Sequence, residues 1–191
     1  DRFAFNDNQK YAYNSMNFSA NWRSIFSEKL TANFSFGYDH YDYRNDESVE
    51  EAAAARLSFA INQWFGKVDF SYKLDNNHTL NFGLMSQFYN INSGTYEPLH
   101  ESSLVKWDQL QKDKALESAI YIGDQWEITP KLSVNAGIRY SMFNLLGPRT
   151  YYTYQDGMLP SSTTVVDSVS VGGGKVVKTY QGPEFRLSAR Y

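Results

Sequence analysis

Apolar and polar residues alternate along extended stretches of this chain. In residues 128–143, which read "ITPKLSVNAGIRYSMF", one parity is apolar and the other is small or polar. The apolar set is Leu132, Val134, Ala136, Ile138 and Tyr140. Because successive side chains of a β-strand point to opposite faces, this pattern predicts a strand with one apolar and one polar face.

The same alternation recurs along the chain and predicts seven strands. We expect them at 13–24, 30–43, 56–74, 80–88, 117–126, 132–143 and 183–191. Runs of about ten residues match the length that a tilted strand needs to cross a bilayer, whereas globular strands are typically nearer five or six. The strand lengths therefore favour lipid contact over a soluble core.

The third stretch changes parity part-way along. Leu57, Phe59 and Ile61 are odd, whereas the apolar residues from Trp64 to Tyr72 are even. This slip near 62–63 predicts either a β-bulge or a change of the apolar face above the membrane. Just before this stretch, residues 48–51 match a capping box and precede four alanines, which is consistent with a short helix.

The connections alternate in length. Those at 26–29, 75–78 and 127–131 are short, whereas those at 44–51, 92–116 and 146–181 are long and polar. Short periplasmic turns opposite long extracellular loops are typical of outer-membrane β-barrels. Seven strands are too few to close such a barrel, so we expect an incomplete arc of a larger one. Within the last connection, we expect a hairpin that turns at 172–174.

Composition is consistent with this interpretation. The 191 residues carry a formal net charge of −3, which gives no indication of a nucleic-acid partner. No apolar run is long enough for a spanning helix. Aromatic residues make up 17% of the chain and fall near both ends of the expected strands, as Trp and Tyr do at the two bilayer interfaces. Cysteine is absent, which excludes disulfides and thiolate metal sites.

The two parities give two sets of expected positions. Residues expected to face lipid include Phe18, Trp22, Phe34, Phe36, Val134, Ile138, Tyr140 and Leu187. Residues expected to line the barrel interior include Asn17, Asn21, Arg23, Asn33, Asp39, Lys67, Asp69, Asn81, Gln87, Asn135, Arg139, Glu184, Arg186 and Arg190. The interior set can contact a plug or substrate, or form a hydrated lattice of hydrogen bonds and ion pairs between strands.

Several stretches resemble the barrel of TonB-dependent outer-membrane transporters, especially the large Bacteroidetes-type forms. They are "ALESAIYIGDQWEITPKLSVNAGIRYSMF" at 115–143, "GPEFRLSARY" at 182–191 and "FAFNDNQKYAYNSMNFSANWRSIFSEKLTANFSFGYDHYDY" at 3–43. The resemblance implies a 22-stranded all-β barrel in the bacterial outer membrane, occluded by a plug domain that the periplasmic protein TonB moves. It further implies active import of a siderophore, cobalamin, a glycan or a peptide. On this interpretation residues 1–191 are part of one barrel domain, without a plug domain, and a surface lipoprotein is a possible partner.

The long loops offer candidate ligand contacts. Trp107, Tyr151, Tyr152 and Tyr154 could stack on sugar or aromatic ligands, or could pack within the loops. No cofactor is expected, and an enzyme is not expected, because His40, His78 and His100 stand in no catalytic or metal-binding motif.

Two alternatives stay open. One is a passive porin or adhesin-type barrel without energy coupling, and the other is a soluble β-sandwich or calyx.

Overall fold

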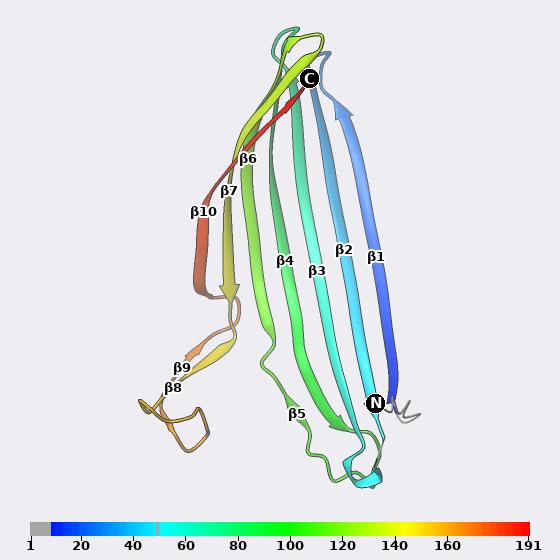
Figure 1. Cartoon of the computed structure of the whole chain (residues 1–191), viewed down its shortest axis with the longest axis vertical. Helices are drawn as coiled ribbons and strands as arrows, with labels where there is room; N and C mark the ends of the chain where they lie inside the picture. Colours follow the sequence, from blue (N-terminus) through cyan, green and yellow to red (C-terminus); the bar gives the residue numbers. More distant parts are fainter. Residues whose placement is uncertain (1–8, 49) are drawn as a thin grey trace.

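The computed structural model describes residues 9–48 and 50–191. Seven long antiparallel strands form one sheet in the order β1-β2-β3-β4-β6-β7-β10 (Figure 1). Their bounds are β1 Gln9–Ile25, β2 Leu30–Glu47, β3 Ala55–Lys73, β4 His78–Pro98, β6 Asp113–Thr129, β7 Leu132–Leu146 and β10 Val176–Arg190. The expectation of about seven antiparallel strands is confirmed, and the described residues contain one short 3-10 helix, η1 Glu51–Ala53, where the capping-box pattern suggested a helix.

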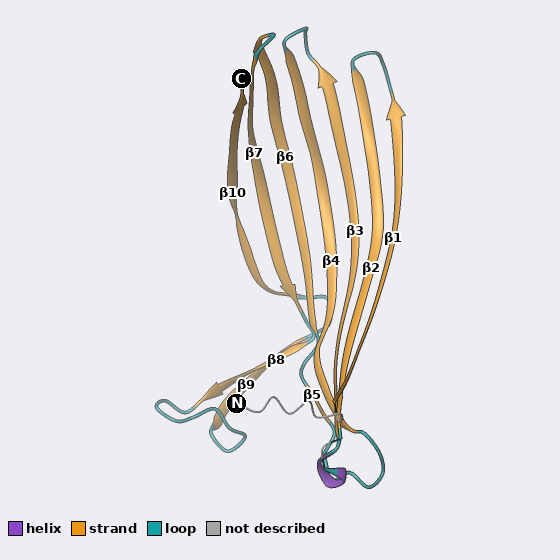
Figure 2. Ribbon diagram, turned by 45° about the vertical axis from the view of Figure 1, so that its right-hand side comes forward, coloured by secondary structure: helices purple, strands orange, loops and turns teal. Residues whose placement is uncertain are grey.

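The sheet is a single curved layer, as Figure 2 shows. Within the described part of the chain, its edge strands β1 and β10 do not pair with each other, so the arc is open. The buried hydrophobic residues of the described part are all alanines, including Ala32 and Ala119, so no second layer of described residues covers an apolar core. The described residues therefore form neither a two-layered β-sandwich nor a closed calyx. No helix among the described residues is long and apolar enough to cross a membrane.

The short and long connections lie at opposite ends of the strands, as expected. We call these the turn end, with connections at 26–29, 74–77 and 130–131, and the loop end. The strands are longer than the ten or so residues expected, because they extend further toward the loop end. The second strand continues to Glu47 and the fourth to Pro98.

The expected hairpin at 172–174 is wrong. Residues Val165–Val171 (β9) pair with Arg149–Tyr154 (β8) in a separate two-stranded sheet, in which Tyr151 faces Val169. The chain after the glycines instead joins the free edge of β7, where Phe185 faces Ile138. The β7 edge offers a ladder along almost all of β10, which a short local hairpin could not provide. The third long connection therefore carries the β8–β9 hairpin, which projects away from the long strands (Figure 2).

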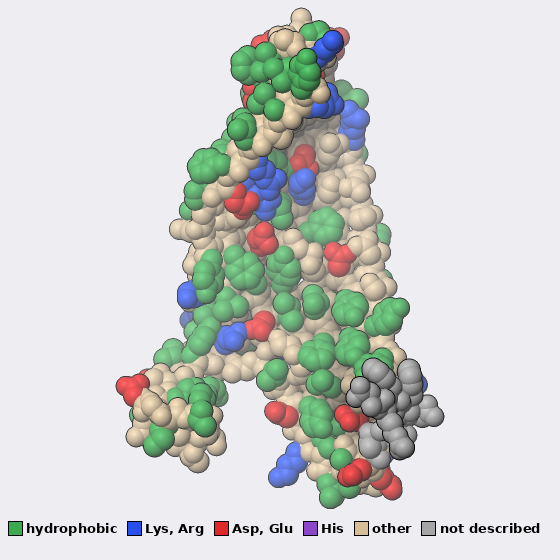
Figure 3. All heavy atoms as spheres, in the orientation of Figure 1, with side chains coloured by type: hydrophobic (Ala, Val, Ile, Leu, Met, Phe, Trp, Pro, Cys, Tyr) green, Lys and Arg blue, Asp and Glu red, His purple; other side chains and the backbone are tan. Residues whose placement is uncertain are grey.

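Cross-strand pairing separates two faces. Trp22 pairs with Phe34 and Phe34 with Val68, so these side chains share a face. On the other face, the Tyr121 hydroxyl reaches Asp69 across β4, and Arg139 reaches Met85 across β6. Contacts over an intervening strand need a sheet that curves toward them, so this face is concave (Figures 1 and 3).

The predicted division of side chains between the two faces agrees with the pairing. All eight residues expected to face lipid lie on the convex face: Phe18, Trp22, Phe34, Phe36, Val134, Ile138, Tyr140 and Leu187. Every residue expected to line the interior lies on the concave face. Contact of the convex residues with lipid stays a prediction.

The parity change in the third strand is a change of apolar face. The register between β2 and β3 is continuous from Leu30–Tyr72 to Glu47–Ala55, so no bulge lies at 62–63. The register shift lies instead between Ser58 and Ala60 against β4, which carries the extra residue beside Gly94. The predicted bulge position is therefore wrong, and the alternative of a face change holds.

Glycines allow close approach on the concave face. A Cβ added at Gly83 would meet the Val68 carbonyl oxygen at 2.3 Å and the Tyr121 hydroxyl at 2.5 Å. The Tyr121 ring therefore crosses the fourth strand at Gly83, a concave position without a side chain. In the same way, Gly37 leaves room for the ring of Phe65.

Candidate functional site

A group of polar and charged side chains spans the concave face toward the turn end. We define this polar network as Lys67, Asp69, Glu117, Tyr121, Arg139, Glu184 and Arg186. Lys67 Nζ lies 2.9 Å from the Asp69 carboxylate, to which the Tyr121 hydroxyl also donates a hydrogen bond. Lys67 and Asp69 lie on the same strand, β3, whereas the Tyr121 hydroxyl links β6 to β3 over the intervening β4.

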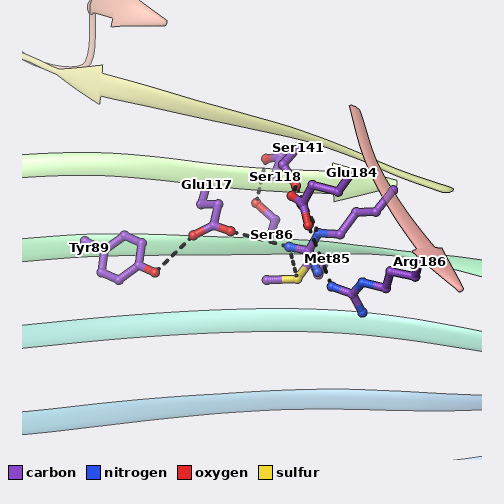
Figure 4. Close-up of polar contacts among 9 residues, drawn as sticks. Met85, Ser86, Tyr89, Glu117, Ser118, Ser141, Glu184 and Arg186 are labelled. Atoms are coloured by element: carbon purple, nitrogen blue, oxygen red, sulfur yellow. Dashed lines mark hydrogen bonds and ion pairs between the residues drawn. The ribbon is translucent and has the colours of Figure 1, made fainter. Parts of the chain in front are cut away.

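Arg139 is the hub of the other half of this network. Its guanidinium lies 3.4 Å from Glu117 and 3.7 Å from Glu184, and it donates a hydrogen bond of 2.9 Å to the Ser141 hydroxyl. Arg186 approaches Glu184 at 3.7 Å from β10 (Figure 4). These side chains tie β6, β7 and β10 together on the concave face. A groove of about 540 Å³ lies beside Lys67, Tyr121, Arg139 and Arg186.

Toward the loop end the concave face changes character. We define the aromatic lining as Tyr11, Tyr13, Tyr41, Tyr43, Phe59 and Tyr96, with Leu57, Ile61 and Ile91 between them. Pairing of Tyr13 with Tyr43 and of Tyr43 with Phe59 places these rings side by side on three strands. Figure 3, which looks onto the concave face, shows charged side chains gathered across the upper middle strands and mostly hydrophobic ones below them.

The rings of the lining contact one another and remain open to solvent. The ring centroids of Tyr11 and Tyr43 are 6.4 Å apart, and those of Tyr43 and Phe59 are 6.1 Å apart. Tyr41 and Tyr96, which do not lie on an edge strand, are still 43% and 42% exposed. Part of each of these two side chains is therefore accessible to a ligand.

On the convex face, the change toward the loop end is from apolar to polar residues, and it occurs beside the aromatic lining. The apolar residues of this face give way to a polar group at the loop end of the first three strands, including His40, Asp42 and Asn62. The His40 ring nitrogens lie 2.8 Å from Asn62 Oδ1 and 3.1 Å from Asp42 Oδ1. Beyond them Arg56 pairs with Asp46 at 2.7 Å. On the turn-end side of this group the convex face is apolar and the concave face polar, whereas on the loop-end side the two characters are exchanged.

Tyr89 marks the border between the two concave regions. It pairs with Gln63 and Ala115, and its hydroxyl donates a hydrogen bond of 3.2 Å to Glu117 of the polar network (Figure 4). Figure 4 also shows Ser86 and Ser118, which share a hydrogen-bond contact of 3.3 Å between adjacent strands.

The loop residues expected to contact a ligand lie outside this lining. Trp107 precedes the short strand β5 (Asp108–Gln109) and is 62% exposed. The three tyrosines lie on β8, where the Tyr152 and Tyr154 rings are 6.5 Å apart and Arg149 lies over the Tyr151 ring. No ring contact joins Trp107 to these tyrosines among the described residues. The structure therefore places the four on adjacent loops without assembling them into one site.

The base of the β8–β9 hairpin is nonetheless fixed to the neighbouring loop. Gln111 accepts a hydrogen bond of 2.9 Å from the Thr150 backbone N–H and donates one of 3.2 Å to the Thr150 carbonyl. Arg149 forms an ion pair with Asp113, which also accepts a hydrogen bond from Ser93. The loops that carry Trp107 and the tyrosines are therefore held next to each other at the rim.

Sequence reasoning did not identify the aromatic lining. The aromatic residues near the strand ends were interpreted as lying at the bilayer interfaces, but pairing places two of them on the concave face, Tyr41 opposite Ser15 and Phe143 opposite Glu117. A usable signal was present. The parity change of the third strand recurs in the first, at Tyr11 and Tyr13, and in the second, at Tyr41 and Tyr43.

Comparison with known proteins adds the family. The family model described as "TonB dependent receptor-like, beta-barrel" matches residues 1–172. The chain belongs to this family. No curated protein matches the chain. The TonB-dependent receptor resemblance of the motifs at 3–43 and 115–143 is thereby confirmed.

Solved structures share the fold of this TonB-dependent receptor barrel segment. The structure titled "Copper transporter OprC" is 11% identical with a TM-score of 0.63, and the match covers 95% of this chain and 29% of that one. The closed form of "Ferric-Catecholate import receptor Fiu" from E. coli K12 is 13% identical with a TM-score of 0.56, covering 96% and 31%. The chain thus spans about a third of the length of these structures. At these identities the likeness concerns the fold, and these relatives are transporters and receptors rather than enzymes.

Proposed function

We propose that residues 1–191 form part of the barrel domain of an outer-membrane active transporter that imports a nutrient with energy from TonB. The aromatic lining takes the substrate at the cell surface. The polar network faces the barrel interior nearer the periplasm, where the plug domain of such a transporter sits. The turn end is periplasmic and the loop end extracellular.

The main support for this proposal is that apolar and polar residues exchange faces between the turn end and the loop end of the strands. A convex face that contacts acyl chains must be apolar, because hydrocarbon cannot satisfy polar groups. The concave face at the same level encloses water or a plug and is polar. Where the strands leave the bilayer, the convex face meets water, and the concave face is free to carry rings. A strand that changes its apolar parity at this level meets both requirements.

The convex residues from Phe18 to Leu187 named above would then contact lipid. The loop residues Trp107, Tyr151, Tyr152 and Tyr154 would surround the entrance, and a surface lipoprotein would have access to the same rim. Their placement on loops that Gln111 and Asp113 hold together supports a shared role at the entrance.

Energy coupling is tested on the full-length protein. Purified receptor is expected to bind the periplasmic domain of TonB and to give no steady conductance in a planar bilayer, because a plug occludes the lumen. A passive porin would instead conduct continuously and ignore TonB. Steady conductance without TonB binding would refute active transport and favour the porin.

The membrane level is tested with single cysteines, since this segment contains none of its own. In a full-length background without other cysteines, Phe36→Cys is expected to be protected from a membrane-impermeant maleimide in intact cells. Asn62→Cys, on the same convex face beyond the exchange, is expected to react. Equal labelling of the two would contradict the assigned bilayer position.

A further inference from the structure

The charges around the aromatic lining restrict the classes of ligand that it can bind. On the concave face, the loop-end positions of β1–β4 carry no lysine or arginine, and their one charged residue is Glu47. A multiply anionic ligand is bound through cations and charge-assisted hydrogen bonds. This wall offers none, so it does not suit a ferric catecholate or another polyanion.

The rings instead form a platform. Tyr11, Tyr43 and Phe59 lie next to each other on three adjacent strands, with interplanar angles of 30° and 32° between neighbours. The spacing of about 6 Å between centroids leaves no gap for another side chain between them. A row of partly exposed rings binds flat apolar surfaces rather than isolated charged groups.

Hydroxyl and amide groups border this platform. All but one of the aromatic residues of the lining are tyrosines, which combine an apolar ring with a polar hydroxyl. Gln9, Ser15 and Asn45 share the concave face with them. The Tyr11 hydroxyl already donates a hydrogen bond of 2.6 Å to Gln9. Apolar faces with a polar rim are the complement of a sugar ring, which has an apolar C–H face and a rim of hydroxyls.

A peptide is the competing ligand, because Leu57, Ile61 and Ile91 are aliphatic. Peptide recognition on a sheet relies on a free strand edge that pairs with the peptide backbone. The rings project from the flat side of the sheet, and the backbones of β2 and β3 already pair with a neighbouring strand on both sides. A peptide lying on the lining would leave its own N–H and C=O groups without partners, at a cost in affinity.

We infer that the aromatic lining binds an uncharged oligosaccharide, with Tyr11, Tyr43 and Phe59 stacking on successive sugar rings. This inference rests on the proposed transport function and names the substrate class of the same site. Tyr13 and Tyr41 extend the contact along the strands, and the neighbouring hydroxyl and amide groups fix its orientation. The lining has room for several sugar units because it crosses four strands, β1 to β4, spaced about 4.8 Å apart.

The test uses the full-length receptor in detergent and a panel of neutral oligosaccharides from α-glucans, β-glucans, mannans, xylans and arabinans. At least one member is expected to bind by calorimetry. The double variant Tyr43→Ala/Phe59→Ala is expected to weaken that binding by about tenfold or more, as loss of central aromatic contacts does. Tyr43→Phe keeps the ring and is expected to retain most of the affinity.

The matched control is Tyr140→Ala, which removes a tyrosine ring from the convex face of the same sheet. It is expected to leave saccharide binding unchanged. Binding of a ferric catecholate or an apolar peptide that falls in the double variant would overturn the inference. Absence of binding by every panel member would also overturn it. These measurements need no TonB, so their failure is separate from failure of energy coupling, which conductance and TonB binding report.

Discussion

The two halves of the concave face use the same strands for different purposes. In the turn-end half, the Asp69 carboxylate pairs with Lys67 of its own strand and accepts a hydrogen bond from Tyr121 across β4. In the loop-end half, the rings of Tyr11, Tyr43 and Phe59 contact one another, and Tyr11 is 59% exposed. The side chains of the turn-end half bind one another and so stabilise the sheet. The loop-end half leaves its side chains available to a ligand.

The difference shows how one β-strand can meet two solvents. A strand has a single alternation of side chains, so its apolar residues can leave one face and appear on the other only by a change of parity. In the second strand that change lies between Tyr38, on the convex face, and Tyr41, on the concave face. The position of the change marks the level at which the surroundings of the barrel change from hydrocarbon to water.

The largest expected effect on stability comes from a substitution at Gly83, beside the polar network. Gly83→Ala places a Cβ against the Val68 carbonyl and the Tyr121 hydroxyl, which must move away from Asp69. Overpacking of this kind costs about 1–3 kcal/mol, and we expect the upper end because one obstacle is backbone. The gel-mobility shift of unheated full-length receptor, followed against temperature, measures the loss.

Gly66→Ala is the matched control for this variant. An added Cβ at Gly66 has no heavy atom within 4 Å, and the position lies on the opposite face of the adjacent strand. The expected change is below about 0.5 kcal/mol. Equal destabilisation by both substitutions would indicate a general sensitivity to glycine loss and would remove the special role of the Tyr121 crossing.

The next effect concerns the hub of the network. Arg139→Met leaves the Glu117 carboxylate without its ion pair in a position where the two side chains are only 18% and 28% exposed. We expect a loss of about 1–2 kcal/mol, below the cost for a fully buried pair because solvent screens part of the interaction. Thermal unfolding of the full-length receptor measures it.

A double-mutant cycle separates charge from packing. Arg139→Met/Glu117→Gln removes both charges and is expected to recover part of the stability. If the double variant were as unstable as the sum of the two single variants, the ion pair would contribute nothing, and the polar half would be held by packing alone.

Much of the fold follows from local pattern. The alternation from Leu132 to Tyr140 is enough to predict a two-faced strand, and the alternating loop lengths predict which ends lie together. The residues of the two faces were predicted because period two is a local property of the sequence. Strand ends were less predictable. The alternation continues at Tyr41 and Tyr43, but there the apolar residues lie on the concave face instead of the convex face.

Other features depend on distant parts of the chain. The glycines at 172–174 give the signal for a turn but do not say which edge the following strand joins, and β10 joins β7. The contact of Tyr121 with Asp69 needs the curvature of the sheet and the missing side chain at Gly83, neither of which a strand pattern contains. The aromatic lining was missed because aromatic residues near the strand ends, Tyr41 among them, were attributed to the bilayer interfaces.

The aromatic half is expected to respond in the opposite way from the polar half. Tyr43→Ala and Phe59→Ala remove partly exposed rings, so each should lower the stability by less than about 1 kcal/mol while weakening saccharide binding. Thermal unfolding and calorimetry on the same samples measure both. Variants that unfolded as readily as Arg139→Met would show that the lining is a structural element, and the contrast between the halves would be lost.

The smallest expected effect comes from the Arg56–Asp46 pair. It tests whether the loop-end part of the convex face lies in water. Arg56 donates hydrogen bonds of 2.7 and 2.9 Å to the two carboxylate oxygens of Asp46. These bonds hold the pKa of Asp46 below its ordinary value of 3.8. A lowered carboxylate pKa stabilises the folded state above the unfolded value, and the contribution disappears as pH falls through the lower folded value.

The comparison is between the native receptor and Asp46→Asn. At pH 7 the native protein is expected to be more stable by less than about 1 kcal/mol, because the two side chains are 35% and 21% exposed. The gap in unfolding temperature should close as the pH falls below 3.8, and added salt should narrow it at pH 7. A gap that ignored both pH and salt would mean that bulk water does not reach this ion pair. The convex face would then still be in the bilayer at Asp46. The membrane boundary assigned from the exchange of faces would then lie too close to the turn end.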